Sequence, residues 1–151
     1  MTGPAHRLFG LAFGAGAGAL MTDTHDLVIG AIVFWAALPG STAPDWLEMR
    51  IGGRSLIRHR TLTHWPIPWL ALGVFGFTLM SSTPIAGAGL LGFAVGGCSH
   101  LLGDAGTPMG VPVFTPYGAR YSFRLWRGHQ ELLPVVAAWV SAIYLIESKV
   151  L

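Results

Sequence analysis

Five apolar stretches separated by polar segments limit what this chain can fold into more than any other feature does. They cover residues 8–21, 27–40, 65–80, 85–102 and 132–146. Only 11% of the 151 residues are charged, whereas a soluble domain usually carries about 25%. So few charges cannot cover a globular surface with polar groups. We therefore expect a single integral membrane domain over residues 1–151, an all-α, compact bundle of about five transmembrane or partly re-entrant helices.

The placement of positive charges predicts how this bundle sits in the membrane. The first two stretches are shorter than the ~20 residues that span a bilayer comfortably, so they are expected to be tilted, thin or partly re-entrant. If all five segments cross, Lys149 alone among the nine Lys and Arg residues lies opposite the N-terminus. The positive-inside rule then places the N-terminus and the long loops in the cytoplasm. A net charge of only +2, with arginines between apolar segments, gives no support for nucleic-acid binding.

The segment RHRTLTHWP, residues 58–66, concentrates histidine, arginine and threonine in an otherwise apolar chain. His59 and His64 are five residues apart, which on a straight helix separates their side chains by roughly 140°. A loop leading into a helix can bring them together, with Thr63 as a cap and Pro66 in the first turn. The alternative is a solvated basic loop between two spans.

Two stripes of small residues place further ionisable groups at the same membrane face. His6, Gly10, Gly14 and Gly18 recur every four residues, and so do Gly92, Gly96, His100 and Asp104. Small residues at this spacing let helices approach closely in lipid. We expect the two glycine faces to meet and to bring His6 beside His100 and Asp104. Alternatively, each stripe packs against another span and Asp104 only orients His100.

Several blocks of sequence together resemble the YdjM-type membrane-bound metal-dependent hydrolases, a group of small bacterial inner-membrane proteins. The blocks are AHRLFG at 5–10, PD at 44–45, RHRTLTH at 58–64, SHLLGDAGTPMGVPVFTP at 99–116 and YSFRL at 121–125. The resemblance implies that one or more divalent metal ions are surrounded by His6, Asp45, His59, His64, His100 and Asp104. The chain departs from the family pattern at Leu47, where members often carry a second aspartate, and Glu48 follows it. It also departs at Thr61 and Trp65 of HRTLTHW, where the family has glycine and serine.

The implied ligand set predicts both the metal and the chemistry. Imidazole and carboxylate ligands without thiolates suit Zn²⁺, Mn²⁺ or Fe²⁺. The expected function is metal-dependent hydrolysis of a membrane-associated ester, with an amphiphilic phosphate as a possible substrate and the lipid bilayer as surroundings. Arg60, and less directly Arg58, would contact a substrate phosphate or carboxylate. Glu131 or Glu48 would accept a proton. The oligomeric state is not predicted.

Other roles and other classes of protein remain as alternatives. Thr61 and Thr63 are expected to act as caps or as hydrogen-bond partners of the histidines, and Thr107 to act near Asp104. His129 is expected to be a loop residue. The cluster could instead hold a structural metal or help a partner to assemble, without catalysis. Ligation of haem by two histidines is disfavoured because His100 alone ends a long uninterrupted span. A transporter is disfavoured because no ionisable residue lies near the middle of a span.

Overall fold

The structure is a computed structural model that describes residues 1–48, 50–51, 54–55, 57–127 and 130–150. Within these ranges, long helices follow the five predicted stretches: α1 (Gly3–Thr24), α2 (Leu27–Gly40), α4 (Pro66–Leu79), α5 (Pro84–Ala105) and α6 (Leu132–Val150). A short helix, α3 (Ala43–Trp46), and a single 3-10 turn, η1 (Leu62–His64), lie between α2 and α4. The predicted all-α class is confirmed.

Two small β-hairpins lie in the two long connections between helices. Strand β1 (Arg50–Ile51) pairs antiparallel with β2 (Arg54–Ser55), and Arg50 is opposite Ser55. Strand β3 (Val111–Pro112) pairs antiparallel with β4 (Arg120–Tyr121), and Val111 is opposite Tyr121. With two residues each, these strands shape the loops and add no layer to the bundle.

The helix boundaries show what an apolar pattern can and cannot locate. Helix α2 has the predicted limits, and Asp26 caps it by accepting a hydrogen bond from the Ile29 amide at 2.8 Å. Helix α1 begins five residues before the predicted start at Leu8. Its first turn contains Pro4, which is compatible with a helix start because the first amides lack intrahelical partners. That turn has no large apolar side chain, so the apolar pattern did not reveal it.

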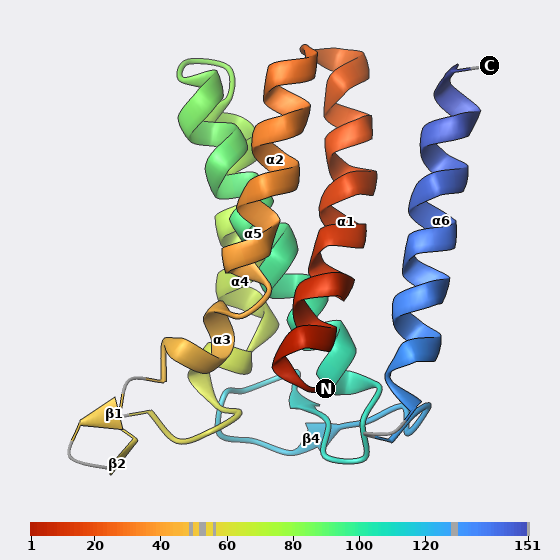
Figure 1. Ribbon diagram of the computed structural model, residues 1–151. Coiled ribbons are helices and arrows are strands. Elements are labelled where there is room, and N and C mark those ends of the chain that lie inside the picture. Colours follow the sequence, from red (N-terminus) through yellow and green to blue (C-terminus); the bar gives the residue numbers. More distant parts are fainter. Residues whose placement is uncertain (49, 52–53, 56, 128–129, 151) are drawn as a thin grey trace.

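The two long polar connections, between α2 and α4 and between α5 and α6, lie at one end of the bundle (Figure 1). The N-terminus, α3, β1, β2 and β4 all lie at this end, whereas the C-terminus lies at the other. Helix α6 stands at the edge of the bundle and packs along α1. By length and apolar character, α5 is the one helix in the described part of the chain that could cross a membrane by itself; α2, α4 and residues 132–148 of α6 are shorter apolar helices.

The glycine stripes pack differently from the prediction that they would face each other. A Cβ at Gly14 would lie 2.7 Å from the Ala37 side chain, and one at Gly18 would lie 2.6 Å from the Gly30 oxygen, both on α2. A Cβ at Gly96 would lie 2.6 Å from the amide nitrogen of Ser41, just after α2. Both stripes therefore pack against α2. The prediction that they would face each other is wrong, whereas the close approach of helices at these glycines is confirmed.

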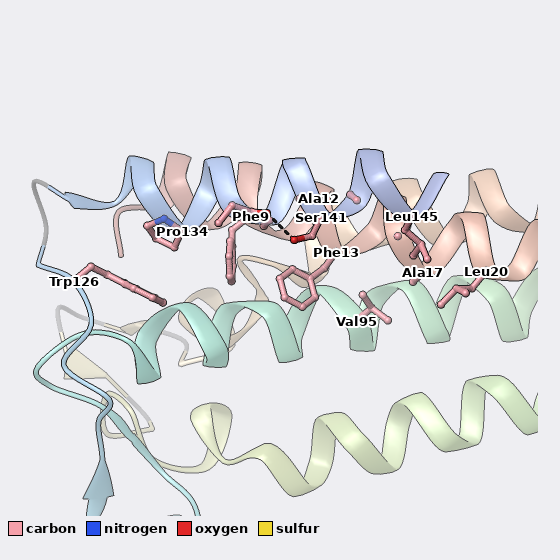
Figure 2. Close-up of a pocket in the computed structure, with 14 residues that line it drawn as sticks. Phe9, Ala12, Phe13, Ala17, Leu20, Val95, Trp126, Pro134, Ser141 and Leu145 are labelled. Carbon is pink, nitrogen blue, oxygen red and sulfur yellow. Dashed lines mark hydrogen bonds between the residues drawn. The ribbon is translucent and has the colours of Figure 1, made fainter. Parts of the chain in front are cut away.

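An apolar groove of about 580 Å³ runs between α1, α5 and α6 (Figure 2). Large side chains from all three helices and from the preceding loop line it: Phe9, Phe13, Leu20, Val95, Trp126 and Leu145. Ser141 is its polar lining residue, and its hydroxyl donates to the Ala137 carbonyl at 2.9 Å. The indole of Trp126 donates a hydrogen bond to the Gly103 carbonyl at 3.2 Å. Gly103 is the residue before Asp104 in the sequence.

Candidate metal centre

The structure brings together side chains from α1, α3, the turn around η1 and the end of α5. Two groups could each hold a metal ion: Asp45, Glu48, His59 and His64 form one, and His6, His100 and Asp104 form the other. Within each group the potential ligand atoms lie within 4.8 Å of one another. All six residues implied by the resemblance belong to these groups. That they bind a metal remains a prediction.

Four donor atoms lie at the centre of the two groups. His64 Nε2 and His100 Nε2 are 3.3 Å apart. Asp45 Oδ1 lies 3.5 Å from the first nitrogen and 3.6 Å from the second. Asp104 Oδ2 lies 3.6 Å from His64 Nε2 and 3.7 Å from His100 Nε2. Donors arranged tetrahedrally around Zn²⁺ at normal bond lengths are separated by about 3.4 Å, so these distances fit a shared ion.

The hydrogen bonds behind the two imidazoles direct their lone pairs toward this centre. His100 Nδ1 lies 2.8 Å from the Ser41 carbonyl oxygen, which can only accept, so this nitrogen carries the proton. His64 Nδ1 lies 3.0 Å from the Thr63 hydroxyl and 3.4 Å from Glu48 Oε1, which favours a proton there too. Neutral rings then present two bare Nε2 atoms to each other, an arrangement that a cation between them stabilises. Metal-binding histidines commonly have such partners on the second nitrogen.

The carboxylate of Asp45 is suited to the ionised form. Burial raises the pKa of Asp45, but the hydrogen bond with His64 outweighs it together with the positive charge that His100, His64 and His6 carry when they are protonated. The pKa of Asp45 is therefore held below its ordinary value. An acid that ionises readily can act as a metal ligand without first losing a proton at neutral pH.

His6 reaches the centre from α1, as predicted from the stripe spacing. Its ring stacks on His100 with centroids 3.7 Å apart, and His6 Nε2 lies 3.3 Å from Asp104 Oδ1. The same Asp104 oxygen accepts a hydrogen bond from the Met1 amino group at 2.8 Å. His6 Nδ1 is buried and has no partner among the described residues. Such atoms are rare, and one beside a cluster of donors is consistent with a site for a bound ion or water.

Glu48 lies behind the histidines. His59 Nδ1 is 2.9 Å from both carboxylate oxygens, and the Arg60 amide donates to Oε1 at 3.1 Å. The Glu48 side chain is 4% exposed, whereas that of His59 is 54% exposed. Glu48 therefore supplies, near Leu47, the second carboxylate that this segment otherwise lacks. Its contacts favour orientation of His59 and His64, and its role as a proton acceptor stays a prediction.

Arg60 is buried and forms an ion pair with Asp104. Its Nη2 lies 2.7 Å from Asp104 Oδ2, and its Nη1 donates to the Gly110 carbonyl at 3.1 Å and to the Thr107 hydroxyl at 3.4 Å. Its φ of 56° is uncommon for a residue with a side chain. Strained backbone of this kind tends to occur at functional sites. Thr107 thus acts near Asp104, as predicted, and its hydroxyl also donates to the Asp104 carbonyl.

Glu131 holds the start of α1. One carboxylate oxygen accepts from the Thr2 amide and the other from the Thr2 hydroxyl, both at 2.6 Å. A carboxylate at this position also interacts favourably with the positive end of the helix dipole. This arrangement fixes the segment that carries Met1 and His6 to the cluster. A proton-accepting role for Glu131 stays a prediction, because both oxygens already have partners.

Two smaller predictions have different outcomes. Pro66 occupies the first turn of α4 as expected, but the cap residue is Trp65, and Thr63 does not cap the helix. The Thr63 hydroxyl contacts His64 instead, because η1 turns it toward that ring. The Thr61 hydroxyl donates to the Arg58 carbonyl within the same turn. His129 lies outside the described residues.

The arrangement defines a helical protein with a His, Asp and Glu cluster at one end of its bundle that could hold a metal ion. The family model described as YdjM inner membrane protein matches residues 1–150. The chain therefore belongs to the YdjM family of inner membrane proteins, as the sequence resemblance indicated. Searches of curated proteins and of solved structures found no match.

Proposed function

We propose that this protein is a metal-dependent hydrolase of a membrane-associated ester, with a phosphoester as the preferred class. The observation that carries the proposal is a set of four donor atoms, on Asp45, His64, His100 and Asp104. The two histidine nitrogens are 3.3 Å apart, and each lies 3.5–3.7 Å from both carboxylate oxygens, which suits one shared ion. His6 and His59 extend this set on either side. Nitrogen and oxygen donors without thiolate favour Zn²⁺, Mn²⁺ or Fe²⁺.

The protein's own residues would bind and orient the reactants. A bound divalent ion supplies Lewis-acid polarisation and a nucleophile at neutral pH. Glu48 and the Ser41 carbonyl hold the histidine rings in position, and Arg60 fixes the Asp104 carboxylate. The half-exposed side chains of Asp45 and His59 form the open side of the cluster, where a substrate can approach.

The surroundings of the cluster favour an amphiphilic substrate. The site lies at the end of the bundle that carries the long polar loops. Trp126, which lines the apolar groove, donates to the carbonyl of Gly103, the residue before Asp104. We propose that the helices cross the membrane several times, with this end in the cytoplasm, because the arginines concentrate there. A headgroup could then reach the cluster while its chain stays among apolar side chains.

The direct test is turnover by the purified full-length protein in detergent. After loading with Zn²⁺, Mn²⁺ or Fe²⁺ in turn, we expect one ion to support cleavage of amphiphilic phosphoesters, and a chelator to reduce the rate to background. Released phosphate or alcohol is measured, with amphiphilic carboxylic esters as a comparison panel. If the protein binds metal stoichiometrically but cleaves none of the substrates, the hydrolase proposal is contradicted and a structural metal site is favoured.

A second prediction concerns the carboxylate behind the histidines. Glu48→Gln keeps the size of the side chain but removes the charge that stabilises protonated Nδ1 on His59 and His64. Changes of this kind behind a ligand typically weaken metal binding by about 10- to 100-fold. The affinity is measured by competition with a chromogenic chelator. Glu147→Gln, an exposed change on α6, is the matched control and should bind metal as wild type does.

A further inference from the structure

A second cavity lies beside the metal-ligand cluster and is lined by positive charge. Its volume is about 250 Å³, several times the ~30 Å³ that a water molecule occupies in liquid water. Its wall combines the turn before η1 with the loop between β3 and β4: Arg58, Arg60, Thr61, Pro116, Tyr117, Gly118 and Arg120. Three of these residues are arginines, and none is acidic.

Two of the arginines are held in place by other residues, whereas the third has no side-chain partner among the described residues. Arg120 Nη2 donates to the His59 carbonyl at 3.0 Å, and Arg60 is fixed by Asp104 and Gly110. The Arg60 Nε–H is buried and has no acceptor in the described part of the chain. The Arg58 guanidinium has no hydrogen-bond or ion-pair partner within the described ranges. The Arg58 guanidinium therefore keeps its donors available at the cavity wall.

Carboxylates of the described residues balance the positive charges around this cavity only in part. Asp104 neutralises Arg60, but no carboxylate of the described residues pairs with Arg58 or Arg120. Like charges that share a cavity repel each other, and a bound anion removes that cost. The planar guanidinium fork matches the oxygens of phosphate with paired hydrogen bonds. An anion with several oxygens suits this wall better than a halide does.

We propose that the cavity of Arg58, Arg60 and Arg120 is a phosphate-binding site, separate from the metal ligands. Arg60 joins the two sites, because Asp104 Oδ2, which it contacts, lies 3.6 Å from His64 Nε2. The site would bind a phosphate group other than the one that is hydrolysed. This group is either a second phosphate of the substrate headgroup or the phosphate released as product. This assignment to the reaction rests on the proposed function, whereas phosphate affinity itself does not.

Binding of inorganic phosphate to the full-length protein in detergent, stripped of metal with a chelator, tests the site. We expect calorimetry to detect binding, and Arg58→Gln and Arg120→Gln each to raise the Kd by about tenfold or more, as loss of a charge-assisted contact predicts. Arg58→Gln removes no contact within the described residues, so it should fold normally. Arg58→Lys keeps the positive charge but loses the paired N–H donors of the guanidinium. Its Kd for phosphate should therefore lie between those of wild type and Arg58→Gln.

Arg124→Gln is the matched control, because it makes the same charge change in the neighbouring loop outside the cavity lining. Its Kd should equal that of wild type. A parallel measurement with vesicles separates the sources: preference for phosphatidic acid over phosphatidylcholine, lost in Arg58→Gln, identifies a lipid phosphate, and its absence identifies free phosphate. Unchanged Kd values in both cavity variants, or binding only with metal present, would overturn the site. Phosphate binding without turnover would reject only the hydrolase proposal.

Discussion

His64→Ala is expected to abolish stoichiometric metal binding while the protein still inserts and folds. His64 Nε2 lies within 3.6 Å of the donor atoms of His100, Asp45 and Asp104, so it contacts every other member of the central set. Its loss leaves three donors and opens the cluster. The effect should exceed the 10- to 100-fold typical of residues behind the ligands. Elemental analysis of the purified protein, in metal ions per chain, gives the measurement.

His25→Ala is the matched control for this experiment. His25 is exposed at the turn between α1 and α2, at the end of the bundle away from the cluster, and should not affect metal content. Asp104→Asn is a second test, because it keeps the side-chain shape while weakening the contacts with Arg60 and Met1. Equal metal content in wild type, His64→Ala and Asp104→Asn would refute the ligand assignment.

The helices were predictable because apolar stretches are a local property of the chain. The limits of α2 match the prediction, and α4, α5 and α6 follow their predicted stretches closely. The early start of α1 was missed because its first turn has no large apolar side chain and because Glu131, which binds Thr2 just before the helix, lies 129 residues further along the chain. The hairpins of two-residue strands have no apolar signal that could have indicated them.

The site was predictable as a set of residues but not as a geometry. The resemblance assembled the right side chains at one end, and the stripe spacing correctly placed His6 beside His100. Neither signal revealed the Ser41 carbonyl that fixes the tautomer of His100, because a backbone oxygen carries no sequence signature. Pairing of Arg60 with Asp104 was also missed, since the interpretation assigned Arg60 to a substrate. Glu48 had one usable signal, its position three residues after Asp45.

The packing of α5 against α2 leads to a prediction about stability and metal binding together. A Cβ on Gly96 would clash with the Ala37 carbonyl oxygen and lie 2.6 Å from the Ser41 amide nitrogen. Both are backbone atoms, so no rotamer change can relieve the overlap. The helices must move apart, and overpacking of this kind typically costs about 1–3 kcal/mol. Because the Ser41 carbonyl also positions His100, the same displacement should weaken metal binding.

Gly96→Ala should therefore lower both the unfolding midpoint in detergent and the metal affinity. Gly89→Ala, in the same helix, is the control, because a Cβ there meets nothing within 4 Å. Alanine is a better helix former than glycine by about 1 kcal/mol, so this control should be neutral or more stable than wild type. Helical circular dichroism during denaturation gives the midpoints, and chelator competition gives the affinities. Matching midpoints for the two variants would show that α5 does not depend on contact with the backbone of α2. A lowered midpoint with unchanged metal affinity would instead separate the helix packing from the position of His100.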